Sequence, residues 1–315
     1  MDKYINDALI GNGRMLASYS DKGELLNKML ISSMIGVKIN DSAIIYLHDD
    51  INNHYSQKYV EDTNILTTNI ENTYFNLQIE QIDFVTIKKD IIIKQYTLKN
   101  NNSIDLKIDF LIHSGFMKSV NDAVSARIFN DSLLQYSYDS TFAIFSDRKI
   151  AYKQLHNSKD NIRSGVIYGK DYIGMTNDSS IGYDLDVLKP GESKKICIYV
   201  YAKDNSKSGS FEDIANEIDK IRKIDSQKEF NVVKKFWEKY IEKYYNLKEK
   251  NYGDKVYDIY KRTILLFPLL TNQKTGGIIA SMEMDENRQK SGGYRILLDK
   301  RCNICNKSFR FIRHV

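Results

Sequence analysis

One seven-residue stretch decides the class of fold that this sequence favours: Ile104-Asp105-Leu106-Lys107-Ile108-Asp109-Phe110. Apolar and charged residues alternate along it, which is the two-residue period of a β-strand with one buried and one solvent-facing side. The turn-forming run Asn-Asn-Asn-Ser at 100–103 comes directly before it, and residues 91–98 have the pattern of the preceding strand. The stretch therefore predicts antiparallel β-structure.

Other segments on both sides of this stretch show the same strand character. We predict further strands over residues 74–82, 140–145 and 196–201. The last of these follows Lys189-Pro190-Gly191-Glu192-Ser193, in which proline fixes one turn dihedral and glycine accepts a positive φ. Because no regular helices intervene, the fold class is mainly β, with an N-terminal antiparallel sandwich over residues 1–205.

The periodicity changes after residue 205. Apolar residues recur at three- and four-residue steps, which predicts helices over 211–224, 227–245 and 254–270. The third helix becomes apolar on most sides at 264–270, and Pro268 is expected to kink or end it because proline lacks a backbone donor. Linker helices are thus predicted over 206–250 and the beginning of a helical domain over 251–294.

Charge and composition exclude several partners. The formal charge is +5, but residues 295–315 hold six Lys or Arg against one Asp, so the rest of the chain is balanced and no nucleic-acid partner is expected. No apolar run approaches the roughly 18 residues of a membrane span, so no membrane partner is expected either. The acidic N-terminus is unlike a signal peptide, and three cysteines make a disulfide framework improbable. We expect a cytoplasmic protein.

Two segments carry a resemblance to a known family. Residues 273–281 read Gln-Lys-Thr-Gly-Gly-Ile-Ile-Ala-Ser and are followed by Ser-Gly-Gly-Tyr at 291–294, while residues 9–17 read Leu-Ile-Gly-Asn-Gly-Arg-Met-Leu-Ala. The chain resembles the bacterial, glucoamylase-type branch of glycoside hydrolase family fifteen. The resemblance implies an antiparallel super-β-sandwich, linker helices and then an (α/α) barrel of six helical hairpins. It also implies inverting release of glucose from the non-reducing ends of α-glucans.

The sequence departs from that family after Tyr294. The family continues Gly-Tyr-x-Trp-x-Arg-Asp, whereas this chain continues Arg-Ile-Leu-Leu-Asp-Lys-Arg at 295–301. A permitted coding string for residues 295–310, read one nucleotide later, gives Gly-Tyr-Cys-Trp-Thr-Arg-Asp. We therefore interpret residues 295–315 as an out-of-frame tail and the chain as an N-terminal fragment with a truncated barrel. Resequencing the coding DNA around the Tyr294 codon is expected to show the slip, and an unchanged frame through residue 315 would contradict it.

The same resemblance assigns few site residues. The family takes both catalytic glutamates from later barrel loops, so no catalytic residue is expected in this chain. Tyr294 stands four positions before the Trp of the restored motif, where the family places a tyrosine that lines the innermost glucose subsite. Tyr294 is thus the one expected substrate-binding residue, and the expected partner of the intact protein is an α-glucan or maltooligosaccharide.

The remaining candidates favour plain structural roles. Cys302, Cys305 and His314 fall one ligand short of a structural zinc site, so neither a metal nor a cofactor is expected. The acidic residues of 283–286 indicate a solvated loop, with a supporting role near the glucose site as the alternative. Trp237 and the tyrosines are predicted to be core rather than sugar platforms. A non-catalytic carbohydrate-binding or structural sandwich stays open as the alternative function.

Overall fold

The structure, a computed structural model, describes residues 8–26, 30–116, 123–138, 140–204, 211–244, 253–273, 275–279 and 297–298. Strands dominate the first two thirds of the chain. They are β1 (Ala8–Gly11), β2 (Leu16–Tyr19), β3 (Leu25–Leu26), β4 (Leu30–Ile39), β5 (Ala43–Tyr46), β6 (Asn53–Tyr59), β7 (Leu66–Asn72), β8 (Leu77–Val85), β9 (Ile91–Asn100), β10 (Leu106–Phe116), β11 (Ser125–Phe129), β12 (Ser132–Tyr136), β13 (Ser140–Ser146), β14 (Tyr152–Gln154), β15 (Asp178–Leu188) and β16 (Ser193–Asp204).

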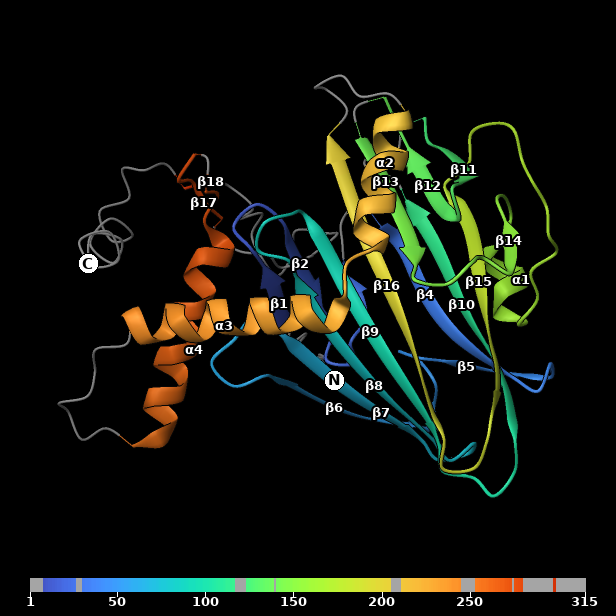
Figure 1. Cartoon of the computed structure of the whole chain (residues 1–315), viewed down its shortest axis with the longest axis horizontal. Coiled ribbons are helices and arrows are strands. Elements are labelled where there is room, and N and C mark those ends of the chain that lie inside the picture. Colours follow the sequence, from blue (N-terminus) through green and yellow to red (C-terminus); the bar gives the residue numbers. More distant parts are fainter. Residues whose placement is uncertain are drawn as a thin grey trace, which may run out of the picture.

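Two large antiparallel sheets face each other (Figure 1). The larger has the order β11-β12-β13-β16-β9-β8-β7-β6, and the smaller has the order β14-β15-β10-β4-β5. Apolar side chains of both sheets form one core, in which the Tyr96 ring of β9 lies 4.9 Å from the Phe110 ring of β10. A small sheet, β1-β2-β3, completes the sandwich. The predicted mainly β, antiparallel architecture is confirmed for the described residues.

The alternation of apolar and charged residues over 104–110 matches the observed burial over most of its length. Leu106, Ile108 and Phe110 lie in the core between the sheets, as predicted. Ile104 is the exception, because it precedes β10 and is 59 % exposed. Asp109 was predicted to face solvent, yet it is buried, and its carboxylate accepts a hydrogen bond of 3.3 Å from the Tyr152 hydroxyl. β10 lies in the interior of its sheet, between β15 and β4, so neither of its edges is free.

The predicted strand over 74–82 begins later than expected. β8 starts at Leu77, because residues 73–76 form the turn that joins it to β7. Asn76 adopts a left-handed conformation with φ of 42°, which asparagine tolerates better than most residues. Tyr74 therefore lies at an exposed turn and not on a strand. The turn at 189–193 is confirmed, with φ of 74° at Gly191.

Helices cover the outer face of the larger sheet (Figure 1). They are α2 (Phe211–Arg222), α3 (Ser226–Tyr244) and α4 (Asp254–Leu270), in addition to the short α1 (Lys159–Arg163) beside β15. A second core joins Ile91 and Ile93 of β9 to buried residues of these helices, such as Trp237. Ile92 points the other way, into the sandwich. Both faces of β9 are thus buried at these positions, and the prediction that Trp237 is a core residue is confirmed.

The three predicted helices are confirmed, with bounds within two residues of those expected. α4 has the predicted bounds and continues past Pro268 to Leu270, so Pro268 does not end it. Of its apolar run, Ile264, Leu265 and Leu269 are buried in the second core.

The predicted barrel start, 251–294, is described only at α4, at residues 271–273 and 275–279 and at the two-residue strand β17 (Ile278–Ile279), which pairs with β18 (Leu297–Leu298). The rest of the predicted barrel start lies outside the described residues. Within the described part of the chain, no helix combines the length and apolar character needed to cross a membrane.

Candidate functional site

The residues that the sequence singled out for substrate lie outside the described ranges. This holds for Tyr294, for the acidic residues of 283–286, and for Cys302, Cys305 and His314. The described residues that follow α4 and precede Tyr294 form the segment 271–273 and 275–279, and residues 297–298 are described beyond it. The candidate site is therefore approached through this segment and the part of the sandwich that holds it.

The turn between β6 and β7 binds the middle of α4 through hydrogen bonds and an ion pair. The Asn64 side-chain amide donates a hydrogen bond of 2.9 Å to the Leu265 carbonyl, and the Arg262 guanidinium donates one of 3.0 Å to the Thr63 carbonyl. Lys261 forms an ion pair of 3.0 Å with Asp62. Because Pro268 lacks an N–H group, the Ile264 carbonyl loses its usual helical donor, and the Asn64 amide donates to the next carbonyl along α4, that of Leu265. The position of α4 is thus fixed by hydrogen bonds as well as by apolar packing.

Arg262 also connects α4 to the first strand. Its guanidinium lies 3.8 Å above the Tyr59 ring, a cation–π contact. The Tyr59 hydroxyl donates to the Leu9 carbonyl at 3.0 Å and accepts from the Leu9 N–H at 2.7 Å. Burial lowers the pKa of Arg262 and raises that of Tyr59, and the side chains remain a charged guanidinium on a neutral phenol. Sequence reasoning missed these residues, since their partners lie about two hundred positions away.

The segment after α4 is hydrogen-bonded to the turn between β1 and β2, a contact that we call the lock. The Gln273 N–H donates to the Gly13 carbonyl at 3.0 Å, and the Gln273 side-chain amide donates to the Asn12 carbonyl at 2.7 Å. Asn12 is buried, and its side chain donates to the Thr86 carbonyl at 2.9 Å and accepts the Arg14 N–H at 2.9 Å. The two segments that carried the family resemblance, 9–17 and 273–281, therefore contact each other directly.

Two features make glycine necessary at position 13 of this lock: its backbone conformation and the close approach of Gln273. Its φ is 79°, and a Cβ atom there would lie 2.7 Å from Gln273 Cγ. Gly191 has nearly the same φ, 74°, but open space around the missing Cβ. We expect Gly191→Ala to cost about 1–2 kcal/mol from the left-handed backbone alone. Gly13→Ala is expected to cost about 1–3 kcal/mol more because it also displaces Gln273.

Chemical denaturation of both variants measures this difference, and proteolysis at 271–279 should accelerate in Gly13→Ala alone. Equal behaviour of the two variants would show that the contact with Gln273 contributes nothing.

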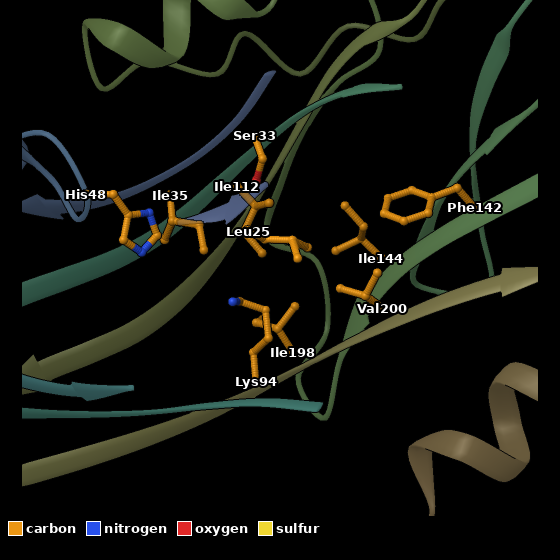
Figure 2. Close-up of a pocket in the computed structure, with 10 residues that line it drawn as sticks. All are labelled: Leu25, Ser33, Ile35, His48, Lys94, Ile112, Phe142, Ile144, Ile198 and Val200. Carbon is orange, nitrogen blue, oxygen red and sulfur yellow. The ribbon is translucent and has the colours of Figure 1, made fainter. Parts of the chain in front are cut away.

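A group of polar residues is enclosed between the two sheets, beside a small cavity (Figure 2). The Lys94 ammonium forms an ion pair of 2.7 Å with Asp83, and the Gln81 amide donates to the second Asp83 oxygen at 2.6 Å and to the Gly23 carbonyl at 2.8 Å. These two acceptors fix the orientation of the Gln81 amide. Its oxygen therefore accepts from His48 Nε2 at 3.1 Å, which makes His48 the Nε2-protonated tautomer.

Burial governs the titration of these groups. It raises the pKa of Asp83 and lowers that of Lys94, and in each case the partner's charge opposes the effect. Burial also lowers the pKa of His48 to about 3. The residues that line the cavity include Lys94 and His48 but no carboxylate. Since inverting glycoside hydrolysis needs two carboxyl groups facing one sugar, this cavity is part of the sandwich core and not a hydrolytic site.

A serine–histidine–aspartate group lies where α1 meets β10 and β15. The Ser158 hydroxyl donates to Asp178 at 2.7 Å, and Ser180 donates to Ser158 at 2.7 Å. His113 Nδ1 is 3.2 Å from Ser180 and 3.5 Å from Asp178. A catalytic triad would place the serine and the carboxylate on opposite nitrogens of the imidazole. Here one nitrogen faces both groups, so the arrangement anchors α1 and does not form a triad.

Metal ligands do not converge in the described part of the chain. No three His, Cys, Asp or Glu side chains gather closely enough there to hold a metal ion. Cys197 is buried in β16, and burial raises the pKa of its thiol to about 12. It is a small apolar residue of the second core rather than a nucleophile.

A comparison with known proteins gives chemical information about the chain. No model of a known protein family matches the chain. An uncharacterized glycosyl hydrolase of Methanocaldococcus jannaschii is 26 % identical over 292 residues, which cover 87 % of this chain and 46 % of the relative. The chain is glycoside hydrolase-like.

Solved structures agree at the level of the fold. A bacterial glucoamylase in complex with acarbose matches this glycoside hydrolase-like chain with a TM-score of 0.62 and 11 % identity, over 90 % of this chain and 45 % of the glucoamylase. A human-microbiome protein assigned as a kojibiose phosphorylase matches with a TM-score of 0.52 and 12 % identity, over 74 % of this chain and 35 % of that protein. The chain thus spans about half, or less, of the length of these relatives.

Proposed function

We propose that the chain supplies the N-terminal sandwich and the first barrel elements of an inverting, exo-acting α-glucan hydrolase of the glucoamylase type. The observation that carries the proposal is the lock between Gln273 and the Asn12–Gly13 turn. It joins the two segments whose sequence resembles that family, in a chain whose fold is glucoamylase-like. In this proposal α4 and residues 271–279 hold the loop that leads to Tyr294, and Tyr294 lines the innermost glucose subsite.

We further propose that this 315-residue chain releases no glucose by itself. Inverting hydrolysis needs one carboxylic acid to protonate the leaving oxygen and one carboxylate to activate water, roughly 6.5–9.5 Å apart. The family resemblance assigns neither role to any carboxylate of this sequence. The partner of the intact protein is proposed to be a maltooligosaccharide or a longer α-glucan.

The test compares two proteins made from one gene. Incubation of the 315-residue protein with maltoheptaose is expected to give no glucose above a buffer blank. Removal of one nucleotide after the Tyr294 codon is expected to give a longer protein that releases glucose, with the β-anomer formed first because the reaction inverts. In that protein Tyr294→Ala should raise KM, since one wall of the subsite is lost.

Two results would contradict this proposal. Glucose release by the 315-residue protein, at a rate that survives repeated purification, would refute the absence of turnover. A restored protein that folds but cleaves no α-glucan, or that yields the α-anomer, would refute the inverting glucoamylase chemistry.

A further inference from the structure

The loop over residues 165–177 presents apolar side chains to solvent. It connects α1 to β15 and runs along the edge of the sandwich between β14 and β11 (Figure 1). Tyr168 is 61 % exposed, Tyr172 36 %, Ile173 101 % and Met175 69 %. Single exposed apolar residues are ordinary on protein surfaces, but four within eight residues form a patch of the kind that marks a binding site.

The backbone of this loop is held in place at several points. The Tyr168 N–H donates to the Gln154 side-chain oxygen at 3.2 Å, and the Lys170 carbonyl accepts from the Leu155 N–H at 3.1 Å. At the other end the Thr176 N–H donates to the Val124 carbonyl at 2.7 Å. The loop is thus pinned to both sheets of the sandwich. Its exposed side chains stand on a fixed support, which lowers the entropy lost when a ligand binds.

The Tyr172 ring is oriented by its neighbours. It stacks on the His156 imidazole, with ring centroids 4.2 Å apart and planes inclined by 13°. His156 Nδ1 in turn lies 3.2 Å from the Thr176 hydroxyl. Gly174 approaches so closely that a Cβ atom there would lie 2.9 Å from Tyr172 Cε1. The tyrosine ring is therefore presented in one orientation.

Charged groups of both signs lie beside the two tyrosines. Lys153 and Asp171 form an ion pair of 2.7 Å, with side chains 37 % and 69 % exposed, so they keep hydrogen-bonding capacity toward solvent. The Lys170 ammonium lies 5.8 Å from the centre of the Tyr168 ring. The patch combines flat apolar rings with exposed donors and acceptors of nearly balanced charge.

We propose that this loop surface, made by Tyr168, Tyr172, Lys153 and Asp171, binds a glucan chain. A glucose unit has an apolar C–H face, which packs on a tyrosine ring, and a rim of hydroxyls, which bond to charged or polar groups. The near balance of charge suits a neutral polyhydroxylated ligand and not a nucleic acid. The inference rests on the proposed function for the identity of the sugar.

The loop surface is distant from α4 and β17, the elements that in the proposed function lead to the glucose subsite. Figure 1 shows the α1 and β14 end of the sandwich on the side opposite to α4 and β17. Two sites so placed engage different parts of one polymer, or different chains of a starch granule. The loop surface therefore holds polysaccharide and takes no part in bond cleavage.

The experiment measures binding of maltoheptaose by calorimetry and of granular starch by co-sedimentation, with the 315-residue protein. We expect saturable binding that weakens roughly tenfold in Tyr168→Ala and in Tyr172→Ala, the most that one ring contact contributes. Tyr172→Phe should bind like the unchanged protein, because it keeps the ring. The matched control is Tyr74→Ala, which removes a tyrosine that is even more exposed, at 74 %, from the β7–β8 turn and should change binding less than about twofold.

Three outcomes would overturn the inference. The first is that the unchanged protein shows no saturable binding, and the second is that Tyr168→Ala and Tyr172→Ala leave the binding intact. The third is a concentration-dependent dimer that Ile173→Asp abolishes. Such a dimer would make the loop a contact between copies of the chain. Circular dichroism of each variant verifies folding. Glucose release by the frame-restored protein is scored separately. Cleavage without binding at the loop rejects this inference alone, and binding without cleavage rejects the hydrolase proposal alone.

Discussion

Lys94→Met is expected to lower the free energy of unfolding by about 3–5 kcal/mol. Lys94 and Asp83 are the charged pair enclosed between the sheets, with side chains 4 % and 0 % exposed. Removal of the ammonium leaves the Asp83 carboxylate in an apolar interior with the Gln81 amide as a remaining donor. A buried charge without its counter-charge costs far more than a surface pair contributes. Urea denaturation at pH 7 measures the change.

Two further variants separate charge from packing. The double variant Asp83→Leu, Lys94→Met removes both charges and should recover most of the lost stability, because similar volumes are kept and Gln81 still donates to Gly23. Lys107→Met makes the same substitution in an exposed ion pair of 2.9 Å with Asp41 and should change stability little. A double variant no more stable than Lys94→Met alone would show that the pair is held for packing rather than by charge.

Acidification is expected to destabilise the sandwich well above the pH at which carboxylates protonate. Burial lowers the pKa of His48 to about 3 and that of His113 to about 4. The charges of Lys94 and Lys22 lower the pKa of His48 further, while its hydrogen bond to Gln81 raises it. For His113, the Asp178 carboxylate raises the pKa, and the nearby charges of Lys159 and Arg163 lower it further. Both imidazoles are neutral in the folded protein, whereas an unfolded histidine titrates near pH 6.5.

The direction of the pH effect follows from those pKa values. Because the folded pKa is depressed, the unfolded chain takes up protons first, and stability is present in full above about pH 6.5. It is lost as the pH falls from about 6.5 toward 3, by on the order of 4 kcal/mol for His48. Denaturation at pH 7, 5.5 and 4.5 measures the slope.

His48→Gln is expected to flatten that slope, since glutamine keeps a donor for Gln81 and does not titrate. His54→Gln, at an exposed position of β6, serves as the control and should leave the slope unchanged. A slope that His48→Gln does not alter would assign the acid sensitivity to other groups.

Local periodicity predicted what depends on one segment at a time. The bounds of α4 and the inward face of β10 followed from spacing alone, because a helix or a strand repeats its burial along its own length. The burial of Lys94 also had a local signal, since the strand period places it on the same face as Ile92 and Tyr96. Its partner could not be predicted, because the register of β9 against β8, which brings Asp83 opposite Lys94, depends on the whole sheet.

The candidate site was predicted unevenly for the same reason. The sequence marked residues 9–17 and 273–281 as unusual, but nothing in either indicated that Gln273 bonds to Asn12, 261 positions away. The hydrogen bonds from Asn64 to Leu265 of α4 and from Arg262 of α4 to Thr63 also join residues that are far apart in the sequence. Tyr294, the expected glucose contact, lies outside the described residues and stays a prediction.

The bond between Asn12 and Gln273 has a consequence for biosynthesis. The first hairpin leaves the ribosome early, yet its partner is translated 261 residues later. At about 5–20 residues per second, that interval is roughly 13–50 s. During this time the nascent chain exposes the Asn12 and Gly13 carbonyls to water or to a chaperone. The first hairpin therefore acquires this contact only after the ribosome has passed α4 and reached Gln273.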